Sequence, residues 1–388
     1  MAKPTKITAV RTYPLLMSGD TSNEHPVACP MSVYPEYRKS RSLWRDDFGP
    51  LLVRIDTDAG IEGVGYTSMG GVACAVTIEL HLKRLLLGQD ANRVERLSDI
   101  MVRSTYHHGR DGFLMHGISA IDLALWDIRG KLAGQPVCSL LGGPVQESLP
   151  CYMTGYDAAK VQRENFLGLK IPLKYGPASG REGLKANVAD VAALRETLGP
   201  DRDIMLDCWM GLDVPYTLEL AHALEPFRVR WIEEPLVAGD IDGYRQLRRA
   251  WRSDTLIATG EHETLVRGAL PFMNERLADV WQADVTWAGG ITEMTKIAAL
   301  ALGAGVKIIP HYGYTPWAAH FILACQASPA IEWYDLTQEF GGGRALFTSD
   351  MALRDGRLFP GSAPGFGVSV DWDVAEANRD RRVTFAGS

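Results

Sequence analysis

The sequence predicts an α/β protein in which a (β/α)8-type TIM barrel follows a smaller α+β domain. The chain has 388 residues, which is more than one ordinary hydrophobic core organises. Beyond residue 145, eight short apolar runs recur, with helix-like segments between most of them. Before that residue, strand-like and helix-like segments occur without this alternation. Alternating strands and helices favour parallel βαβ units, and eight such units indicate a closed barrel.

The first domain is expected to span residues 1–145. Residues 7–15 are strand-like, and residues 49–67 contain two strand-like runs joined by a turn at Asp58-Ala59-Gly60. Residues 117–135 are expected to form a helix that stops at Gly134, just before a proline. Apolar residues recur there at helical spacing: Ile118, Ile121, Leu125, Ile128 and Leu132.

The barrel is expected to span residues 146–335. Its strand candidates are LPCYMTG, GLKIPL, DIMLDCW, RVRWIEEP, LIATGEH, DVWQADV, VKIIPHY and IEWYDL. The clearest helix candidates between them are KANVADVAALRETLG, YTLELAHALEP and GITEMTKIAALALGAG. The remaining segment, 336–388, is rich in Gly and Pro and is expected to pack back on the first domain.

Composition narrows the class of protein. Hydrophobic residues make up 46% and charged residues 22%, as in ordinary globular proteins. The formal net charge of -7 argues against a nucleic-acid partner. No apolar run approaches the roughly 20 residues that span a bilayer, so no membrane partner is expected and the location is expected to be cytoplasmic. The six cysteines form no CxxC pair, which suits reduced thiols.

Three acids follow three consecutive strand candidates. Asp207, Glu233 and Glu261 are separated by 26 residues (207 to 233) and 28 residues (233 to 261), one βα unit each. In a barrel they would converge at the carboxyl ends of the strands, where chemistry takes place. Carboxylates at such short distances repel each other unless a cation lies among them, and hard oxygen ligands favour Mg²⁺. The alternative for any one acid is a solvated loop carboxylate or a helix cap.

The next two strands end in Asp284 and His311. An Asp beside a His can fix its tautomer and raise its basicity, so His311 is a candidate general base. The alternative is a hydrogen-bonded core histidine. Glu234 remains open between a residue that orients the site and a partner in a surface ion pair. Lys170 and Glu332 end the second and eighth strand candidates.

These motifs resemble the enolase superfamily, in its mandelate racemase subgroup, over nearly the whole chain. The resemblance rests on AIDLALWDIRGKLAGQPVCSLLGG, LDCW, WIEEP, TGEH, ADVTWAGGIT and IIPHY. Within the subgroup, the chain is most similar to L-rhamnonate dehydratases, through HPVACPMSVYPEYRKSRSLW, LKIPLKYGP and LDCWMGLDVPYTLELAHALEPFRVRWIEE. The fold implied is the enolase-superfamily barrel with its α+β capping domain.

The resemblance also implies roles for individual residues. Asp207, Glu233 and Glu261 would bind one Mg²⁺ per subunit, and His311, held by Asp284, would be the base. Lys170 and Glu332 would contact the substrate carboxylate. His25 and Arg41 would line the sugar side of the substrate. A homo-oligomer is also expected, because members of the family commonly assemble.

One departure from the subgroup bears on the reaction. Racemases there often carry Lys-x-Lys after the second strand, whereas this chain has Lys170-Ile171-Pro172, with Lys174 two residues further on. This departure disfavours racemisation, and the resemblance implies a sugar acid dehydratase acting on L-rhamnonate, L-lyxonate or L-mannonate. Removal of the C2 proton and of the 3-hydroxyl would give a 2-keto-3-deoxy acid. The alternatives are a racemase or epimerase, and a non-catalytic ligand-binding barrel.

Overall fold

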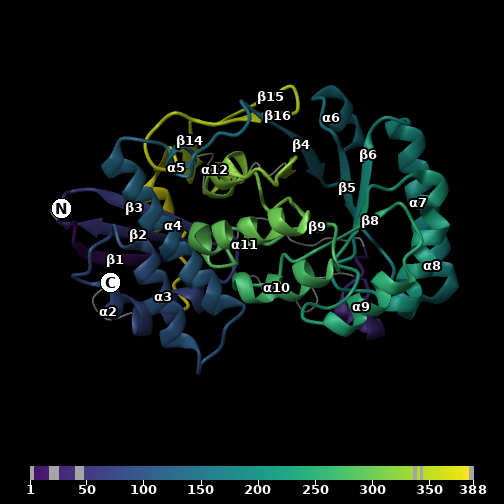
Figure 1. Ribbon diagram of the computed structural model, residues 1–388, viewed down its shortest axis with the longest axis horizontal. Helices are drawn as coiled ribbons and strands as arrows, with labels where there is room; N and C mark the ends of the chain where they lie inside the picture. The colour runs from purple at the N-terminus through teal and green to yellow at the C-terminus, as the bar shows by residue number, and fades with distance from the viewer. Residues whose placement is uncertain (1–3, 17–25, 40–47, 335–338, 341–343, 384–388) are drawn as a thin grey trace.

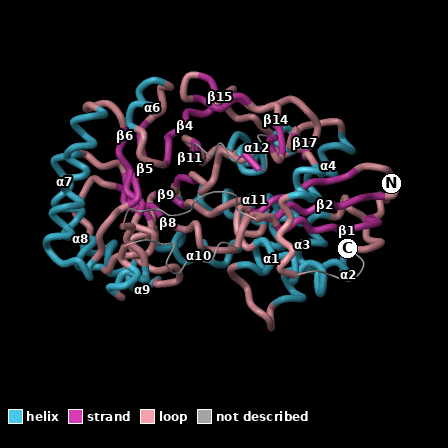
Figure 2. Tube along the Cα trace, turned by 180° about the vertical axis from the view of Figure 1, so that it is seen from behind, coloured by secondary structure: helices cyan, strands magenta, loops and turns pink. Residues whose placement is uncertain are grey.

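The computed structural model describes residues 4–16, 26–39, 48–334, 339–340 and 344–383. Figure 1 shows an α+β unit on one side, built from β1–β3 and α1–α4, and the barrel strands on the other. Seen from behind in Figure 2, the same two units lie side by side, with β14–β17 above the region where they meet. In the described part of the chain, no helix is long and apolar enough to cross a membrane.

The first unit is an antiparallel sheet covered by helices. Its strands, in the order β1-β2-β3, are Ile7–Pro14, Leu51–Thr57 and Glu62–Thr67. The predicted turn joins the last two strands, and Gly60 there has a φ of 72°, which favours glycine. The helices are α1 (Gly71–Thr77), α2 (Lys83–Leu86), α3 (Val94–Thr105), α4 (Phe113–Ala133) and α5 (Val137–Leu140).

Helix α4 is the predicted helix of this unit, and it is buried over most of its length because it packs between the sheet and the barrel. It ends as expected at Gly134, which adopts a left-handed conformation with a φ of 64°. Two glycines of β3 let the backbone of α4 approach the sheet closely. A Cβ atom at Gly65 would lie 1.7 Å from the carbonyl oxygen of Ala120, and one at Gly63 would lie 2.1 Å from that of Ala124.

Gly65→Ala is expected to destabilise the protein, because a backbone carbonyl cannot move aside as a side chain can. Overpacking of a core typically costs about 1–3 kcal/mol. The urea midpoint of unfolding measures the effect. Gly303→Ala in α11 is the matched control, since a Cβ atom there meets nothing within 4 Å and alanine favours a helix. Equal midpoints for Gly65→Ala and the parent would show that α4 and β3 can separate at little cost.

The second unit is the predicted barrel. Its strands β4–β11 are Leu149–Thr154, Gly168–Pro172, Asp203–Asp207, Trp231–Glu233, Leu256–Thr259, Val280–Trp281, Lys307–Ile308 and Ile331–Tyr334. Successive strands from β4 to β10 pair in parallel, and β11 pairs in parallel with β4. All eight strand candidates are confirmed, and so is the fold class.

Helices α6–α12 connect the barrel strands. They are Ala158–Arg163, Gly180–Leu198, Val214–Leu224, Ile241–Ala250, Leu265–Glu275, Gly290–Ala304 and Pro316–Ala324. The three helix candidates of the sequence correspond to α7, α8 and α11. Helix α8 shows why such a segment starts where it does, since Asp213 caps it by accepting a hydrogen bond of 2.8 Å from the Tyr216 N–H.

The C-terminal segment contacts both units. It contains β12 (Glu339–Phe340), β13 (Arg344–Ala345), β14 (Phe347–Ser349), β15 (Ala352–Arg354), β16 (Arg357–Phe359), β17 (Val368–Val370) and α13 (Trp372–Ala377). On the first unit, the Phe366 N–H donates to Asp127 of α4 at 3.0 Å. On the barrel, β16 pairs antiparallel with β4. The limits 1–145, 146–335 and 336–388 stay a prediction of how the chain divides.

Candidate active site

The pleat of the barrel strands explains how the polar residues come together. An apolar cluster fills the amino-terminal end of the barrel interior. Side chains two residues apart on a strand point to the same face, so the residue two positions further on also points inward, nearer the carboxyl end. Six strands follow this rule, with the pairs Tyr152/Thr154, Met205/Asp207, Trp231/Glu233, Val280/Gln282, Ile309/His311 and Ala330/Glu332.

Lys170 lies at the centre of a buried ion-pair network. Its Nζ is 2.5 Å from Glu233 Oε1 and 2.5 Å from Glu332 Oε1, and all three side chains are fully buried. Burial opposes the charge of Lys170, but Glu233 and Glu332 outweigh it and raise the pKa of this lysine well above its ordinary value. Lys170 is therefore held as an ammonium group between two strands, so it is poorly suited to accept a proton.

Glu332 is fixed by further hydrogen bonds. Its Oε2 accepts from the Tyr312 N–H at 2.9 Å, and its Oε1 accepts from the Thr154 hydroxyl at 2.6 Å. Burial by itself would raise the pKa of Glu332, but Lys170 and His311 lower it below the ordinary value. Glu332 thus remains a carboxylate, and its three contacts, with Lys170, Thr154 and Tyr312, hold it in one orientation.

Glu233, the first of the two acids of the WIEEP motif, is held through both of its carboxylate oxygens. Beyond Lys170, its Oε2 accepts from Trp231 Nε1 at 3.0 Å and from Gln282 Nε2 at 2.8 Å. Burial raises the pKa of Glu233 to about 8; Lys170 opposes this shift and Asp207 adds to it. Register places Asp207 directly opposite Glu233 on the neighbouring strands β6 and β7.

Glu234 points to a different partner. It has a φ of 39°, and its Oε2 lies 2.8 Å from Nδ1 of His262. The same nitrogen is 3.5 Å from Glu261 Oε1. Although burial favours the neutral form, Glu234 and Glu261 raise the pKa of His262 to about 10. The sequence left Glu234 open between two roles; its carboxylate is 2% exposed and pairs with a histidine beside the site, so the surface ion pair is excluded.

The acids at these strand ends suit a hard divalent cation. Burial raises the pKa of Glu261 to about 7; His311 opposes the shift and Glu234 adds to it. Glu233 is shifted in the same direction, so two buried carboxylates lack enough positive charge to stabilise their ionised forms. A cation at Asp207, Glu233 and Glu261 would supply that charge through oxygen ligands of the kind that Mg²⁺ prefers.

A second group of donors lies next to this one. Within the described ranges, the group of three whose ligand atoms all lie within 4.8 Å of one another is Glu234, Glu261 and His262. Only Glu261 also belongs to the triad predicted from the sequence. Glu233 is oriented by Lys170, Trp231 and Gln282, which explains why it does not complete a tight group with Glu261.

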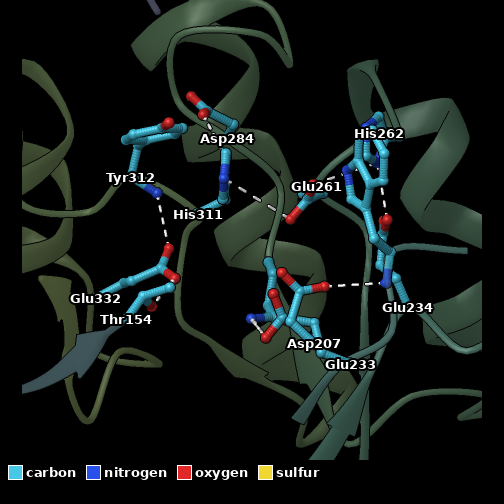
Figure 3. A network of polar contacts seen from close by, with 12 residues as sticks. Thr154, Asp207, Glu233, Glu234, Glu261, His262, Asp284, His311, Tyr312 and Glu332 are labelled. Atoms are coloured by element: carbon cyan, nitrogen blue, oxygen red, sulfur yellow. Dashed lines mark hydrogen bonds and ion pairs between the residues drawn. The ribbon is translucent and has the colours of Figure 1, made fainter. Parts of the chain in front are cut away.

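His311 and Asp284 form the predicted pair. His311 Nδ1 lies 2.9 Å from Asp284 Oδ2, and the other Asp284 oxygen accepts from the Thr286 N–H at 2.6 Å. His311 Nε2 is left facing the carboxylates, 3.9 Å from Glu261 Oε2. Figure 3 shows His311 between Asp284 and Glu261, with Glu332 and Thr154 to one side and Glu234 and His262 to the other.

The electrostatics around His311 favour its charged form. Burial lowers its pKa, but Glu261 and then Asp284 outweigh burial and raise it to about 9. Because Glu261 is the larger of the two raising effects, a cation held by Glu261 would offset it and return the pKa of His311 towards neutrality. A neutral imidazole with Nδ1–H fixed by Asp284 presents a free Nε2, as a general base requires.

Of the other positions that the sequence singled out, the structure describes Lys174 but not His25 or Arg41. Lys174 lies at the surface, where its Nζ is 2.9 Å from Asp190 Oδ2 of α7. His25 and Arg41 lie outside the described residues. The nearby residues 26–33 are described and run along the carboxyl ends of β5 and β6, where the Ala28 N–H donates to the Leu173 carbonyl at 2.7 Å. In Figure 1 this purple segment lies with the barrel, far from the rest of its own unit.

The sequence reasoning missed several side chains of the site. His262, Gln282 and Thr154 contact the predicted residues directly. Trp287 packs against His311 with ring centroids 4.8 Å apart, and its Nε1 donates to Ser68 of the first unit at 3.0 Å. The period-two rule would have identified Gln282 and Thr154, since each lies two residues after an inward-facing apolar residue. His262 and Trp287 follow their strands in loops, where no such rule applies.

Comparison with known proteins assigns both units to one family. Residues 48–142 match the mandelate racemase/muconate lactonizing enzyme N-terminal domain, and residues 152–374 match the enolase C-terminal domain-like family. The L-rhamnonate dehydratase of Saccharopolyspora erythraea is 40% identical over 353 residues, covering 90% of each chain.

Solved structures agree with this assignment. Rhamnonate dehydratase from Gibberella zeae, complexed with Mg, superposes with a TM-score of 0.89 at 32% identity, covering 98% of this chain and 97% of that one. A racemase from Streptomyces coelicolor A3(2) with bound magnesium has a TM-score of 0.81 at 27% identity, covering 96% of this chain and 100% of that one. The resemblance read from the motifs is confirmed: the chain belongs to the mandelate racemase/muconate lactonizing enzyme family of the enolase superfamily.

Proposed function

We propose that the protein is a Mg²⁺-dependent sugar acid dehydratase that acts on L-rhamnonate or a close relative such as L-lyxonate or L-mannonate. The observation that carries this proposal is the arrangement of a single base. His311 Nδ1 lies 2.9 Å from Asp284, and Nε2 faces the carboxylates, 3.9 Å from Glu261 Oε2. The names of the relatives above support the same substrate class.

Racemisation is disfavoured because it needs a proton donor or acceptor on each face of C2. Pro172 stands where racemases of the subgroup carry the second lysine, and proline cannot take a proton. Lys170 is bound between Glu233 and Glu332, and Lys174 pairs with Asp190. Fold similarity does not decide the question, since both a dehydratase and a racemase superpose well on this chain.

The chain's own residues would act in two proton transfers. His311 Nε2 accepts the C2 proton while Asp284 stabilises the imidazolium that forms. The C2–C3 double bond then forms as the C3–O bond breaks, and the same His311 returns its proton to the leaving hydroxyl, which departs as water. The enol product rearranges to a 2-keto-3-deoxy acid. One base for both transfers makes the elimination syn.

Other residues would bind and orient the substrate and the metal ion. Asp207, Glu233 and Glu261 would hold Mg²⁺, which when bound supplies Lewis-acid stabilisation of the negative charge that develops on the substrate carboxylate. Lys170 and Glu332 would contact that carboxylate end, Lys170 as a fixed ammonium group. Trp287 and the capping unit would exclude water from the His311 side.

A screen of aldonic and aldaric acids with Mg²⁺ present tests the proposal. The measurements are formation of 2-keto acid and uptake of deuterium at C2 in D₂O. The dehydratase proposal predicts keto acid from L-rhamnonate or its near stereochemical relatives. Return of deuterated acid without keto acid would instead identify a racemase. Tight binding with neither product would identify a non-catalytic barrel.

His25 and Arg41 are proposed to choose among sugar acids. Arginine presents a rigid fork of donors that suits vicinal hydroxyls. His25→Ala and Arg41→Ala are expected to lower kcat/KM and to change the ranking of acids that differ at C4 to C6, with metal affinity nearly unchanged. Steady-state kinetics on a panel of such acids measures this. If both variants ranked the acids as the parent does, with the same kcat/KM values, the residues that select the substrate would instead lie in the barrel loops.

We also propose that the protein works as a homo-oligomer in the cytoplasm, as the family resemblance implies. Sedimentation equilibrium of the purified chain tests the assembly, and a mass equal to one chain at working concentration would contradict it.

A further inference from the structure

A pocket of about 540 Å³ lies at the end of the barrel opposite to the candidate active site. Its walls are the segments that lead into β6, β7 and β8, so it opens at the amino ends of these strands. Five arginines line it: Arg195, Arg202, Arg228, Arg230 and Arg252. Three acids line it: Asp203, Glu225 and Asp254. The lining thus carries a net charge of +2 (five minus three), although the chain as a whole carries -7.

Backbone carbonyls, rather than carboxylates, hold four of these five guanidinium groups in place. Arg195 donates to the carbonyl of Phe227 at 3.0 Å, and Arg202 donates to that of Phe166 at 2.7 Å. Arg252 donates to two carbonyls at the end of α9. Among the residues that the structure describes, none of the five arginines has a carboxylate oxygen within 4.0 Å. Four of the five guanidinium groups are therefore oriented by carbonyl oxygens without a close ion pair, and Arg228 is the fourth, donating to the Pro200 carbonyl at 3.1 Å.

The acids of the pocket balance only part of its positive charge. Asp203 is the acid that interacts with Arg230 and Arg195, which oppose the rise in its pKa that burial causes. Glu225 lies 3.2 Å from the imidazole of His222, outside the pocket lining. Burial lowers the pKa of Arg195, and the neighbouring Arg228 lowers it further, although Asp203 opposes this; the net lowering is expected where like charges crowd together. Such crowding is unfavourable unless an anion lies among the charges.

We propose that this pocket binds a small polyanion that carries two or more phosphate or carboxylate groups. A guanidinium group matches both kinds of oxyanion through paired N–H donors. A volume of about 540 Å³ lies in the range of small-molecule sites. Because the pocket lies at the other end of the strands, its ligand and the sugar acid can be bound together.

Calorimetric titration of the full chain, loaded with Mg²⁺, tests the proposal. Fructose 1,6-bisphosphate is the phosphate probe and tricarballylate is the carboxylate probe, and whichever binds more tightly identifies the source of the oxyanion. Arg230→Gln is the first variant, because among the described contacts the Arg230 side chain makes no hydrogen bond that holds the fold. Loss of one charge-assisted contact is expected to weaken binding about tenfold or more, with kcat/KM for the sugar acid unchanged.

Arg96→Gln is the matched control, since Arg96 is exposed on α3 and the substitution removes the same charge far from the pocket. It is expected to bind both probes as the parent does. Arg252→Gln provides a second pocket variant with the same expected loss. No saturable binding of either probe, or equal binding by the parent and both pocket variants, would overturn the proposal. A pocket variant that changes the mass of the assembly would also overturn it, because the arginines would then serve a subunit contact.

Discussion

His311→Asn is expected to abolish both dehydration and deuterium exchange at C2, while the sugar acid still binds. A general base typically contributes about 10²–10⁴-fold, and the loss can exceed this range because His311 is proposed to serve as the acid as well. Asparagine keeps a similar size and a polar group near Asp284, so the fold should persist. Single-turnover assays and exchange at C2 followed by NMR measure the loss, and calorimetric titration with the substrate measures the retained binding.

Two companion variants sharpen this test. Asp284→Asn should impair the same step without removing the imidazole, because an amide cannot stabilise the imidazolium as a carboxylate 2.9 Å from Nδ1 does. Lys174→Met should leave exchange unchanged, since Lys174 pairs with Asp190 at the surface. If His311→Asn retained exchange at C2 and Lys174→Met lost it, the base would be Lys174 and the single-base proposal would fail.

Removing the divalent metal is expected to stop turnover completely, and Mg²⁺ should restore it. Glu233→Gln and Asp207→Asn should weaken metal binding by more than the about 10–100-fold that is typical when an outer-shell partner is lost. Competition between the protein and a metal-sensitive dye measures this affinity without relying on activity. Full activity in a metal-free preparation would contradict the assignment.

Glu234→Gln is the matched control for Glu233→Gln, because the two residues are adjacent and the change is the same. Under the proposal Glu234 pairs with His262, so its replacement should leave metal affinity within the range expected for an outer-shell partner. The two donor groups share Glu261, and this pair of variants separates them. If Glu234→Gln lost more metal affinity than Glu233→Gln, the metal site would have to be assigned to Glu234, Glu261 and His262.

Much of the fold was predictable from the sequence because its signals are local. The eight strands and the helices α4, α7, α8 and α11 follow from apolar periodicity, and the stop of α4 follows from Gly134. The placement of Asp207, Glu233, Asp284 and His311 at strand ends follows from the same periodicity, since side chains alternate along a strand and one βα unit separates neighbouring strands.

Only the tertiary structure decided which charges pair. Lys170 and Glu233 are 63 residues apart in the chain, yet they share a buried ion-pair network with Glu332 from β11, the last barrel strand. Glu234 and His262, Lys174 and Asp190, and the arginines of the opposite pocket are further cases. The sequence determined which strand and which face each group occupies. The partner of each group, and therefore its pKa, depends on distances of a few ångströms between distant segments. Packing and side-chain orientation set those distances.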